Sequence, residues 1–195
     1  MIEYSLAPQL MTRFFPRLDR RVRDLGLVLS GSLLVAGLAQ IRIPLPFTPV
    51  PITGQTFAVL LVGAALGARL GAFSLGLYLM EGLVGLPVFA GGAGGVAALL
   101  GPTGGYLAGF LAAAYVVGLL AERGGDRRFR TALPIFLAGE AIIYLFGVPW
   151  LGLYIGFQKA LAAGLYPFLI GDAVKLVAAA LALPAAWNLS RRLRH

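Results

Sequence analysis

Long apolar stretches alternate along the chain with short polar, glycine-rich or proline-rich interruptions. Three of these stretches contain no charged residue: 43–68, 82–121 and 141–158. A helix needs about 20 predominantly apolar residues to cross the hydrocarbon core of a bilayer. The second stretch is therefore long enough for nearly two crossings, and the pattern as a whole indicates a polytopic membrane protein.

The interruptions divide the chain into six predicted transmembrane helices, so the expected fold is an all-α bundle. Their approximate bounds are 25–41, 53–68, 70–86, 103–121, 132–148 and 166–187. We expect one membrane domain over residues 25–190, between a basic N-terminal segment, 1–24, and a basic tail, 191–195. The N-terminal segment is expected to begin as an amphipathic interfacial helix. A signal peptide is the competing interpretation, but the basic segment is long for one and five further spans follow.

Proline and glycine define the connections between these helices. The segment from Pro44 to Pro51 carries alternating prolines, which remove backbone donors and fix φ, so we expect an extended loop. Residues 87–102 contain two glycine clusters and are expected to form a loop with one helical turn at most. Residues 149–165 are apolar but interrupted by glycine, and we expect an interfacial helix there.

The composition leaves little room for a water-soluble fold. Hydrophobic residues make up 59% of the 195 residues and charged residues 12%, and the mean hydropathy is +0.86. Soluble domains carry about 25% charged residues, so this chain has too few polar groups to cover a surface in water. It has no cysteine, and its single histidine is His195, which excludes a disulfide and a Cys/His zinc site. We therefore expect no bound metal.

The charges are unevenly distributed along the chain, which has 16 Lys and Arg residues, 8 Asp and Glu residues and a net charge of +8. With six spans, 13 of the basic residues lie on the side of the two termini and two, Arg42 and Lys159, on the other side. This asymmetry predicts cytoplasmic N- and C-termini in the cell membrane. The expected counter-charges are phospholipid head groups, and no nucleic acid partner is expected.

Four ionisable residues fall within or near the predicted spans: Glu81, Glu140, Asp172 and Lys175. A charge in hydrocarbon is costly, so such residues normally face a cavity or a partner. Asp172 and Lys175 are three residues apart on one helix face, where they can pair. The pair is either structural or part of a binding site, and its place in the outer half of the last span favours a site. Glu81 and Gln55 are expected to face the same outer cavity. For Glu140, protonation, pairing with another helix and contact with a partner stay open.

Residues 101–106 open a predicted span at the outer face. Free backbone N–H groups at a helix start suit an anion, and glycine lets it approach closely, although a plain helix breaker explains the pattern equally well. The sequence lacks several motifs for other chemistry: no Gly-Lys dipeptide of a P-loop, no H-E-x-x-H and no G-x-S-x-G occurs. The chain is therefore not expected to be an enzyme or to hydrolyse ATP itself.

Four motifs occur in a recognisable order and spacing. They are Val-Pro-Ile-Thr-Gly-Gln-Thr at 50–56, Gly-Leu-Pro-Val-Phe-Ala-Gly-Gly at 85–92, Gly-Pro-Thr-Gly-Gly-Tyr-Leu-Ala-Gly-Phe at 101–110 and Pro-Phe-Leu-Ile-Gly-Asp-Ala-Val-Lys at 167–175. Together they resemble the BioY family, the biotin-specific substrate-binding (S) components of energy-coupling-factor (ECF) transporters. The resemblance implies a six-helix protein of the cell membrane that binds biotin from outside with high affinity and carries no cofactor. It also implies partners that supply energy: a transmembrane coupling protein and two cytoplasmic ATP-binding-cassette ATPases.

The resemblance and the residues together predict a substrate site. Its expected members are Asp172, Lys175, Gln55, Glu81, Gly91, Gly92, Thr103, Gly104 and Tyr106. Asp172 can accept a hydrogen bond from a ureido N–H of biotin and Lys175 can donate to the ureido carbonyl. The helix start near Thr103 can hold the carboxylate of biotin, and the reverse orientation is open too. Two loops are expected to close over the ligand as gates, through Pro49 and Pro51 and through Gly94 and Gly95.

Three other functions stay open for the sequence. They are an S component for another vitamin, a membrane enzyme that uses Glu140 or Asp172 as acid or base, and an assembly subunit in which Asp172 and Lys175 form a structural pair. The enzyme is the weakest of these, because no clustered catalytic set accompanies the two carboxyl groups. Biotin binding by the isolated chain separates all of them.

Overall fold

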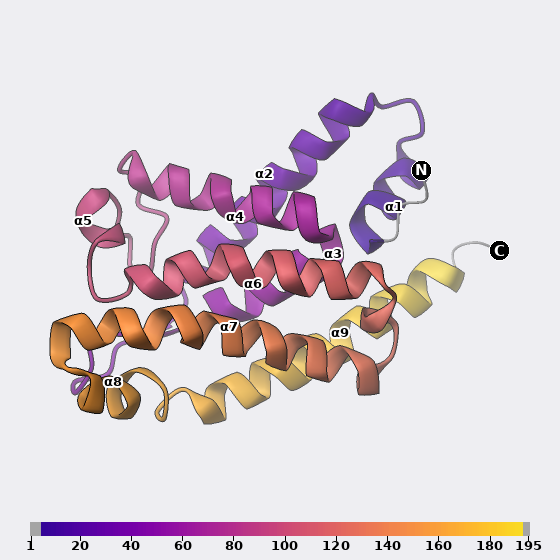
Figure 1. Ribbon diagram of the computed structural model, residues 1–195. Coiled ribbons are helices and arrows are strands. Elements are labelled where there is room, and N and C mark those ends of the chain that lie inside the picture. Colours follow the sequence, from indigo (N-terminus) through magenta and orange to yellow (C-terminus); the bar gives the residue numbers. More distant parts are fainter. Residues whose placement is uncertain (1–4, 193–195) are drawn as a thin grey trace.

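Helices account for most of the computed structural model, which describes residues 5–192 (Figure 1). The α-helices are α1 (Leu6–Phe14), α2 (Arg20–Ala39), α3 (Gln55–Leu66), α4 (Ala68–Leu83), α5 (Val96–Leu99), α6 (Gly104–Glu122), α7 (Phe129–Ile155), α8 (Phe157–Gly164) and α9 (Leu169–Arg192). A 3-10 helix, η1 (Gly125–Arg127), and two strands, β1 (Arg42–Ile43) and β2 (Ile52–Thr53), complete the described elements. His195 and the rest of the predicted tail beyond residue 192 lie outside the described residues.

Helices occur at all six places where the sequence predicts a span, namely α2, α3, α4, α6, α7 and α9. By length and composition, four of the helices within residues 5–192 are able to cross a membrane: α2, α6, α7 and α9. The chain is therefore a multi-pass membrane protein. Helix α3 has only 12 residues, which gives it a length of about 18 Å at 1.5 Å per residue. The number of six spans consequently stays a prediction.

The helix starts differ from the predicted bounds at both ends of the chain. Helix α2 begins at Arg20 rather than near residue 25, because Asp19 caps it and its carboxylate accepts from the backbone N–H of Arg21 at 2.8 Å. An oxygen-bearing side chain at this position satisfies a free N–H of the first turn. Helix α1 forms within the predicted basic N-terminal segment and packs against α2 and α3. At the other end, α9 runs from Leu169 to Arg192.

The predicted end of the fifth helix at residue 148 is wrong, because α7 continues through Pro149. A proline inside a helix removes one backbone hydrogen bond, but tertiary contacts hold the segment that follows. Trp150 Nε1 donates to the carbonyl of Gly101 at 2.9 Å, and Leu151 is fully buried. The helix stops at Gly156, whose φ of +86° suits glycine, and α8 follows where an interfacial helix was expected.

The proline-rich loop is closed at its base by a small antiparallel sheet that the sequence analysis did not predict. Arg42 pairs with Thr53 and Ile43 pairs with Ile52. The backbone N–H of Gly54 also donates to the carbonyl of Ile41 at 3.0 Å. This pairing fixes both ends of the loop beside the start of α3. The other predicted loop, 87–102, contains one short helix, α5, as expected.

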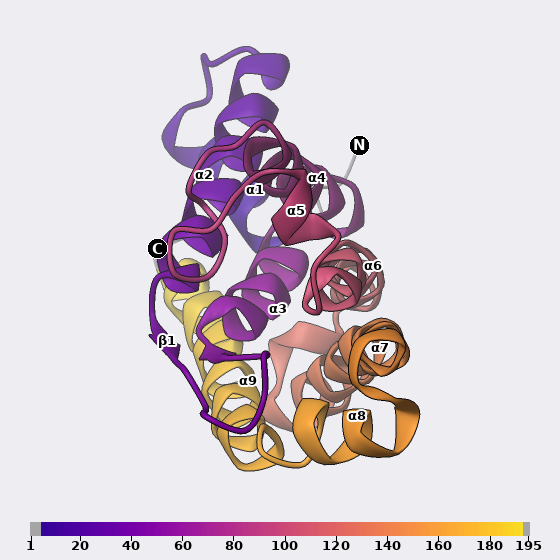
Figure 2. The ribbon, with the colours of Figure 1, turned by 90° about the vertical axis from the view of Figure 1, so that its left-hand side faces the viewer.

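Helix α3 lies at the centre of the bundle, between α2, α4, α6 and α9, and most of its residues are buried (Figures 1 and 2). Small residues let the neighbouring backbones approach. A Cβ added at Gly63 of α3 would lie 2.7 Å from the carbonyl oxygen of Ala114 in α6, and one at Gly109 of α6 would lie 3.1 Å from Ile143 of α7. Close approach of this kind is the usual basis of helix packing in membranes.

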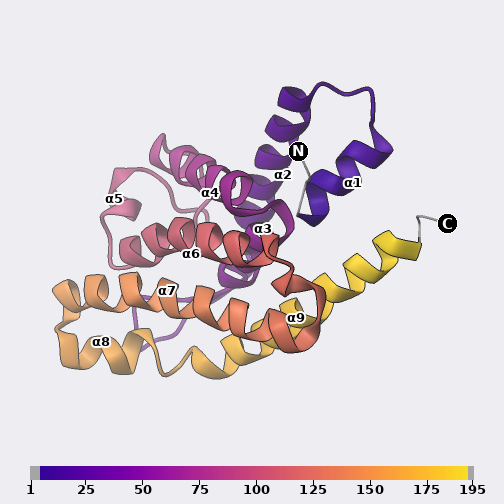
Figure 3. The same cartoon turned by 45° about the vertical axis from the view of Figure 1, so that its right-hand side comes forward.

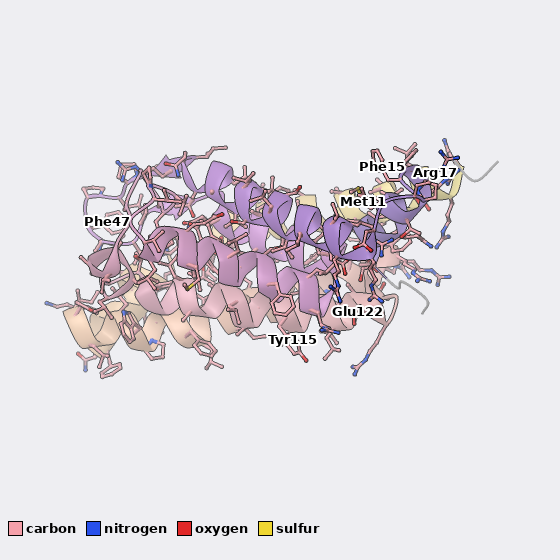
Figure 4. The ribbon with its side chains drawn as sticks, turned by 90° about the horizontal axis from the view of Figure 1, so that it is seen from above. Met11, Phe15, Arg17, Phe47, Tyr115 and Glu122 are labelled. Carbon is pink, nitrogen blue, oxygen red and sulfur yellow. The ribbon has the colours of Figure 1, made fainter. Side chains whose placement is uncertain are left out.

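The two ends of the bundle differ in charge. Helix α1 and the C-terminal end of α9 lie at one end, where Arg13 Nη1 donates to the carbonyl of Ser190 at 3.3 Å (Figures 1 and 3). Figure 4 shows Arg17 and Glu122 at that end and Phe47, in the proline-rich loop, at the other. We call the second of these the loop end. The arginine-rich segments thus gather opposite the loop end, as the six-span arrangement predicts.

Candidate ligand-binding site

A cavity of about 330 Å³ opens at the loop end of the bundle, a size typical of small-molecule sites, which start at roughly 300 Å³. Its walls come from the proline-rich loop, the segment around α5, and helices α3, α6, α7 and α9. The lining residues are Arg42, Pro49, Val50, Pro51, Thr53, Gln55, Thr56, Phe89, Ala90, Ala93, Ala97, Ala98, Gly101, Pro102, Thr103, Tyr106, Leu107, Phe110, Glu140, Ile143, Tyr144, Phe168, Asp172 and Lys175. Apolar residues form the larger part of the lining, and four charged side chains, Arg42, Glu140, Asp172 and Lys175, lie among them.

Five of the nine predicted substrate-binding residues line this cavity: Asp172, Lys175, Gln55, Thr103 and Tyr106. Pro49 and Pro51 of the predicted gating loops line it as well. The other predicted members lie outside the cavity lining, namely Glu81, Gly91, Gly92, Gly104, Gly94 and Gly95. The cavity therefore joins all four sequence motifs, and the second motif contributes Phe89 and Ala90 rather than its glycines.

A polar cluster lies on the α9 side of the cavity. Lys175 Nζ donates to Asp172 Oδ1 at 3.0 Å, and it also donates to Thr56 Oγ1 of α3 at 3.0 Å. The hydroxyl of Tyr144 in α7 donates to Asp172 Oδ2. Asp172 is only 4% exposed, and pairing offsets part of the cost of burying its charge. The predicted pair thus exists, and it connects three helices.

Glu140 extends from α7 into the same cavity. It is 4% exposed, and its Oε1 atom is buried without a hydrogen-bond partner among the described residues. Asp172 and Lys175 face the same space. The carboxyl group that the sequence analysis left unassigned is therefore part of the site.

Gln55 stands at the start of α3 with both ends of its amide engaged. Its Nε2 donates to the hydroxyl of Tyr78 at 2.6 Å, and its Oε1 accepts from Thr53 Oγ1 at 3.1 Å. The Tyr78 hydroxyl in turn donates to the carbonyl of Val88 at 3.2 Å. Gln55 therefore ties the loop after α4 to the start of α3.

Tyr106 presents its ring rather than its hydroxyl to the cavity. The hydroxyl donates to the carbonyl of Gly164 in α8 at 2.8 Å. The ring lies against Gly147, where a Cβ would overlap it. Because its hydroxyl is already bound, Tyr106 supplies an apolar wall and fixes α8 in place.

The start of α6 supplies Thr103, whose side chain makes no capping hydrogen bond. Gly104, the next residue, lies outside the cavity lining because its backbone packs against Leu99 of α5, where a Cβ would overlap the carbonyl oxygen. The tight turn before the helix therefore needs glycine for packing, and the helix start faces the cavity through Thr103.

Gly91 and Gly92 belong to a loop that is fastened to the end of α2. Gly92 donates its backbone N–H to Gln40 Oε1 at 3.0 Å, and Gln40 Nε2 donates to the carbonyl of Phe89 at 3.3 Å. Gly91 lies against the guanidinium of Arg42, and a Cβ there would overlap it. These glycines therefore hold Arg42 and Phe89 at the cavity rather than lining it themselves.

Glu81 lies on a different face of α4 from the one expected. Its Oε2 accepts from Ser32 Oγ of α2 at 2.5 Å, so it links two helices. The reason is the direction of α4, which packs against α2 as well as α3 and α6. Sequence position near an outer helix end did not reveal this orientation.

The sequence analysis missed Tyr144, Thr56 and Arg42 as residues of the site. Tyr144 is four residues after Glu140 and shares its helix face, which is a signal the sequence does contain. Arg42 is exposed at the mouth of the cavity, and Thr56 belongs to the first motif. Phe89, Phe110, Ile143 and Phe168 form apolar walls.

The charged groups of the cavity are divided between its buried side and its exposed side. Within residues 5–192 no group of three His, Cys, Asp or Glu side chains is placed to hold a metal ion. Donors and acceptors stand together at the buried side, at Lys175, Asp172 and Glu140, while a separate cation, Arg42, stands at the exposed side. A fitting ligand has a compact polar head that both donates and accepts, an apolar middle and an anionic end.

The sequence profile of the BioY family matches residues 9–192. The chain belongs to the BioY family. This confirms the family that the four motifs resemble. The biotin transporter BioY of Thermotoga maritima is 46% identical over 151 residues, which cover 77% of this BioY chain and 86% of that protein. The probable biotin transporter BioY of Pyrococcus horikoshii is 40% identical over 159 residues, which cover 82% and 93%.

A solved structure has the same fold. It is the crystal structure, at 2.1 Å, of the S-component for biotin from an ECF-type ABC transporter. It matches this BioY chain with a TM-score of 0.78 and 29% identity, over 91% of this chain and 94% of the other. The helix arrangement described above is therefore that of an S component.

Proposed function

We propose that this chain is the biotin-binding membrane subunit, or S component, of an ECF-type vitamin uptake transporter. The observation that carries the proposal is the polar cluster of Asp172, Lys175 and Tyr144 at one side of a largely apolar cavity. Biotin has a ureido ring with two N–H donors and one carbonyl acceptor, an apolar thiophane ring and a valerate carboxylate. These polar, apolar and anionic parts match the cavity, which has a polar cluster at its buried side, apolar walls, and the cation Arg42 at its exposed side.

In this proposal the ureido ring lies at the buried cluster. The Asp172 carboxylate accepts from a ureido N–H, and the Lys175 ammonium donates to the ureido carbonyl. Hydrogen bonds to charged groups contribute about 1.5–3 kcal/mol, so the two together account for a large part of the selectivity. The aromatic side chains Phe89, Phe110 and Phe168 surround the thiophane ring.

The carboxylate of biotin lies at the mouth of the cavity. The start of α6 at Thr103 offers backbone N–H groups and the positive end of a helix dipole. Arg42, which the sequence analysis did not include, adds a full positive charge at the exposed side of the same cavity. Together these groups favour an anion where the chain of the ligand reaches solvent.

Capture takes place at the extracytoplasmic face, and both termini lie in the cytoplasm. This topology is supported by the arginine-rich segments at the end opposite the cavity, since cytoplasmic loops are enriched in Lys and Arg. The loops that carry Pro49 and Pro51, and Gly94 and Gly95, close over the ligand. Delivery inward depends on a transmembrane coupling protein and two ATP-binding-cassette ATPases, because the chain has no P-loop of its own.

The test is calorimetry of the purified, detergent-solubilised chain with biotin, and with lipoic acid and thiamine as controls. We expect selective binding of one biotin per chain and a large loss of affinity in Asp172→Asn. The melting temperature of the ligand-free variant is measured as well, because removing one partner of a buried ion pair also lowers stability. A folded chain that binds no biotin rejects the proposal. Selective binding of another vitamin instead assigns the cavity to that ligand.

A further inference from the structure

Glu140 carries a buried hydrogen-bonding atom for which the protein provides no partner. Buried side-chain atoms without a hydrogen bond are few in the part of the chain that the structure describes, and Glu140 Oε1 is one whose residue lines the cavity. A buried polar atom without a hydrogen bond destabilises a protein. Such an atom is tolerated where a bound molecule supplies the missing partner.

The other polar side chains at the buried side of the cavity are already engaged with one another. Both carboxylate oxygens of Asp172 accept hydrogen bonds, one from Lys175 and one from Tyr144. The amide of Gln55 is engaged at both ends and the hydroxyl of Tyr106 at its only donor. Glu140 Oε1 is therefore the carboxyl oxygen that a ligand reaches without displacing an existing hydrogen bond.

A cyclic urea presents three polar groups in a row: an N–H, a carbonyl oxygen and a second N–H. If Asp172 accepts from one N–H and Lys175 donates to the carbonyl, the second N–H needs an acceptor on the other side of the ring. We propose that Glu140 is this acceptor and that it makes the site specific for ligands with two N–H groups. This inference rests on the proposed function, because it takes biotin as the ligand.

The charges of the site agree with this role. Glu140 and Asp172 face one cavity with one buried-side cation, Lys175. Two carboxyl groups that share a single cation are stabilised by additional N–H donors, which the urea supplies in the bound state. The same donors are absent from a ligand that offers only acceptors, so the pair of carboxyl groups discriminates against it.

The first experiment uses the wild-type chain and three ligands: biotin and its two derivatives methylated on one or the other ureido nitrogen. Each derivative keeps the carbonyl, the thiophane ring and the carboxylate but lacks one N–H donor. Both derivatives are expected to bind roughly 10- to 100-fold more weakly than biotin, the range for one hydrogen bond to a charged acceptor. If either derivative binds as tightly as biotin, one N–H has no acceptor and the inference is overturned.

The second experiment repeats these titrations with Glu140→Met, which keeps the length of the side chain and removes both oxygens. Biotin is expected to bind the variant roughly 10- to 100-fold more weakly than it binds the wild type. One methylated derivative should bind the variant nearly as well as biotin does, because the N–H that it lacks is the one whose acceptor the substitution has removed. The other derivative should still bind the variant roughly 10- to 100-fold more weakly than biotin does. Equal losses for both derivatives, as in the wild type, would show that neither N–H contacts Glu140.

Two further variants separate folding from recognition. Glu140→Gln keeps the shape and one acceptor oxygen. We expect it to lose less biotin affinity than Glu140→Met, and again one methylated derivative should bind it little more weakly than biotin does. This variant tests the inference if Glu140→Met does not fold. Glu122→Gln, at the opposite end of the bundle, makes the same chemical change where Glu122 accepts from the backbone N–H of Ala68, and it should bind biotin as the wild type does. If the folded wild-type chain does not bind biotin, the proposed function and this inference are both rejected. If Glu140→Met binds biotin as tightly as the wild type, the inference alone is rejected.

Discussion

Gly91 and Gly92 form a matched pair that tests whether Arg42 acts on the ligand. Both have a φ of +73°, so an alanine at either position carries the same backbone strain, about 1–2 kcal/mol. Their surroundings differ. A Cβ at Gly91 would lie 2.7 Å from Arg42 Nε and closer still to Cζ and Nη1, whereas at Gly92 the nearest heavy atom, Pro87 Cβ, is 4.0 Å away. Gly91→Ala therefore displaces the guanidinium, and Gly92→Ala leaves it in place.

The expected difference in biotin affinity follows from the exposure of Arg42. Because the guanidinium faces solvent, its attraction for the ligand carboxylate is screened and contributes about 1 kcal/mol at most. That energy corresponds to about a fivefold difference in Kd. Gly91→Ala should therefore bind biotin more weakly than Gly92→Ala, by up to about fivefold, while the strain lowers the melting temperature of both variants equally.

The assay is calorimetry at low ionic strength with biotin and with biotin amide, in which the carboxylate charge is removed. The two variants should bind the amide equally, and the difference for biotin should shrink as salt is added. Combining Gly91→Ala with Arg42→Met should give no further loss beyond Arg42→Met alone. Equal biotin affinity of the two single variants would refute the role of Arg42, and the same fivefold difference for the amide would place the effect in the shape of the loop instead.

Three further predictions concern other parts of the chain. Asp172→Asn should weaken biotin binding roughly 10- to 100-fold in calorimetry, and an unchanged Kd would remove Asp172 from the site. Gly63→Ala should destabilise the ligand-free bundle by about 1–3 kcal/mol, because its Cβ meets the Ala114 backbone; Gly37→Ala, with nothing within 4 Å, should be neutral or stabilising by up to about 1 kcal/mol in thermal melts. At the opposite end of the bundle, burial raises the pKa of Asp126 in the loop before α7. The protonated form therefore favours folding, and that stability is lost as pH rises through the folded-state pKa. Asp126→Asn should gain melting temperature relative to the wild type at pH 8 and lose that gain toward pH 4; a constant difference would contradict this.

The hydrophobic pattern alone predicted where the long helices lie, because apolar stretches between breakers dominate this sequence. It failed where tertiary contacts override a local breaker. Pro149 is a strong signal for a helix end, yet the hydrogen bond of Trp150 to Gly101 and the burial of Leu151 carry α7 onward. The pairing of Arg42 and Ile43 with Ile52 and Thr53 was equally hidden, since two-residue strands have no periodicity to detect.

Contacts of the candidate site between two residues of one helix could be predicted from the sequence, whereas contacts between residues of different helices could not. The spacing of Asp172 and Lys175 by itself predicts their ion pair. The contacts of Tyr144 with Asp172 and of Thr56 with Lys175 depend on how α7, α3 and α9 are oriented, which no local pattern records. For the same reason Glu81 was assigned to the cavity, although its helix turns it toward Ser32.

Three helices that begin at the loop end, α3, α6 and α9, explain why three of the sequence motifs converge on one cavity. Each motif contains a helix start, so each brings the positive end of a helix dipole toward the ligand. Asp172 lies in the first turn of α9, where that dipole and Lys175 together stabilise its negative charge. Burial removes water from the carboxylate, and these two groups replace part of the stabilisation that is lost. The cavity can therefore offer a charged acceptor to a neutral polar head, and this strengthens each hydrogen bond without placing a net charge on the ligand.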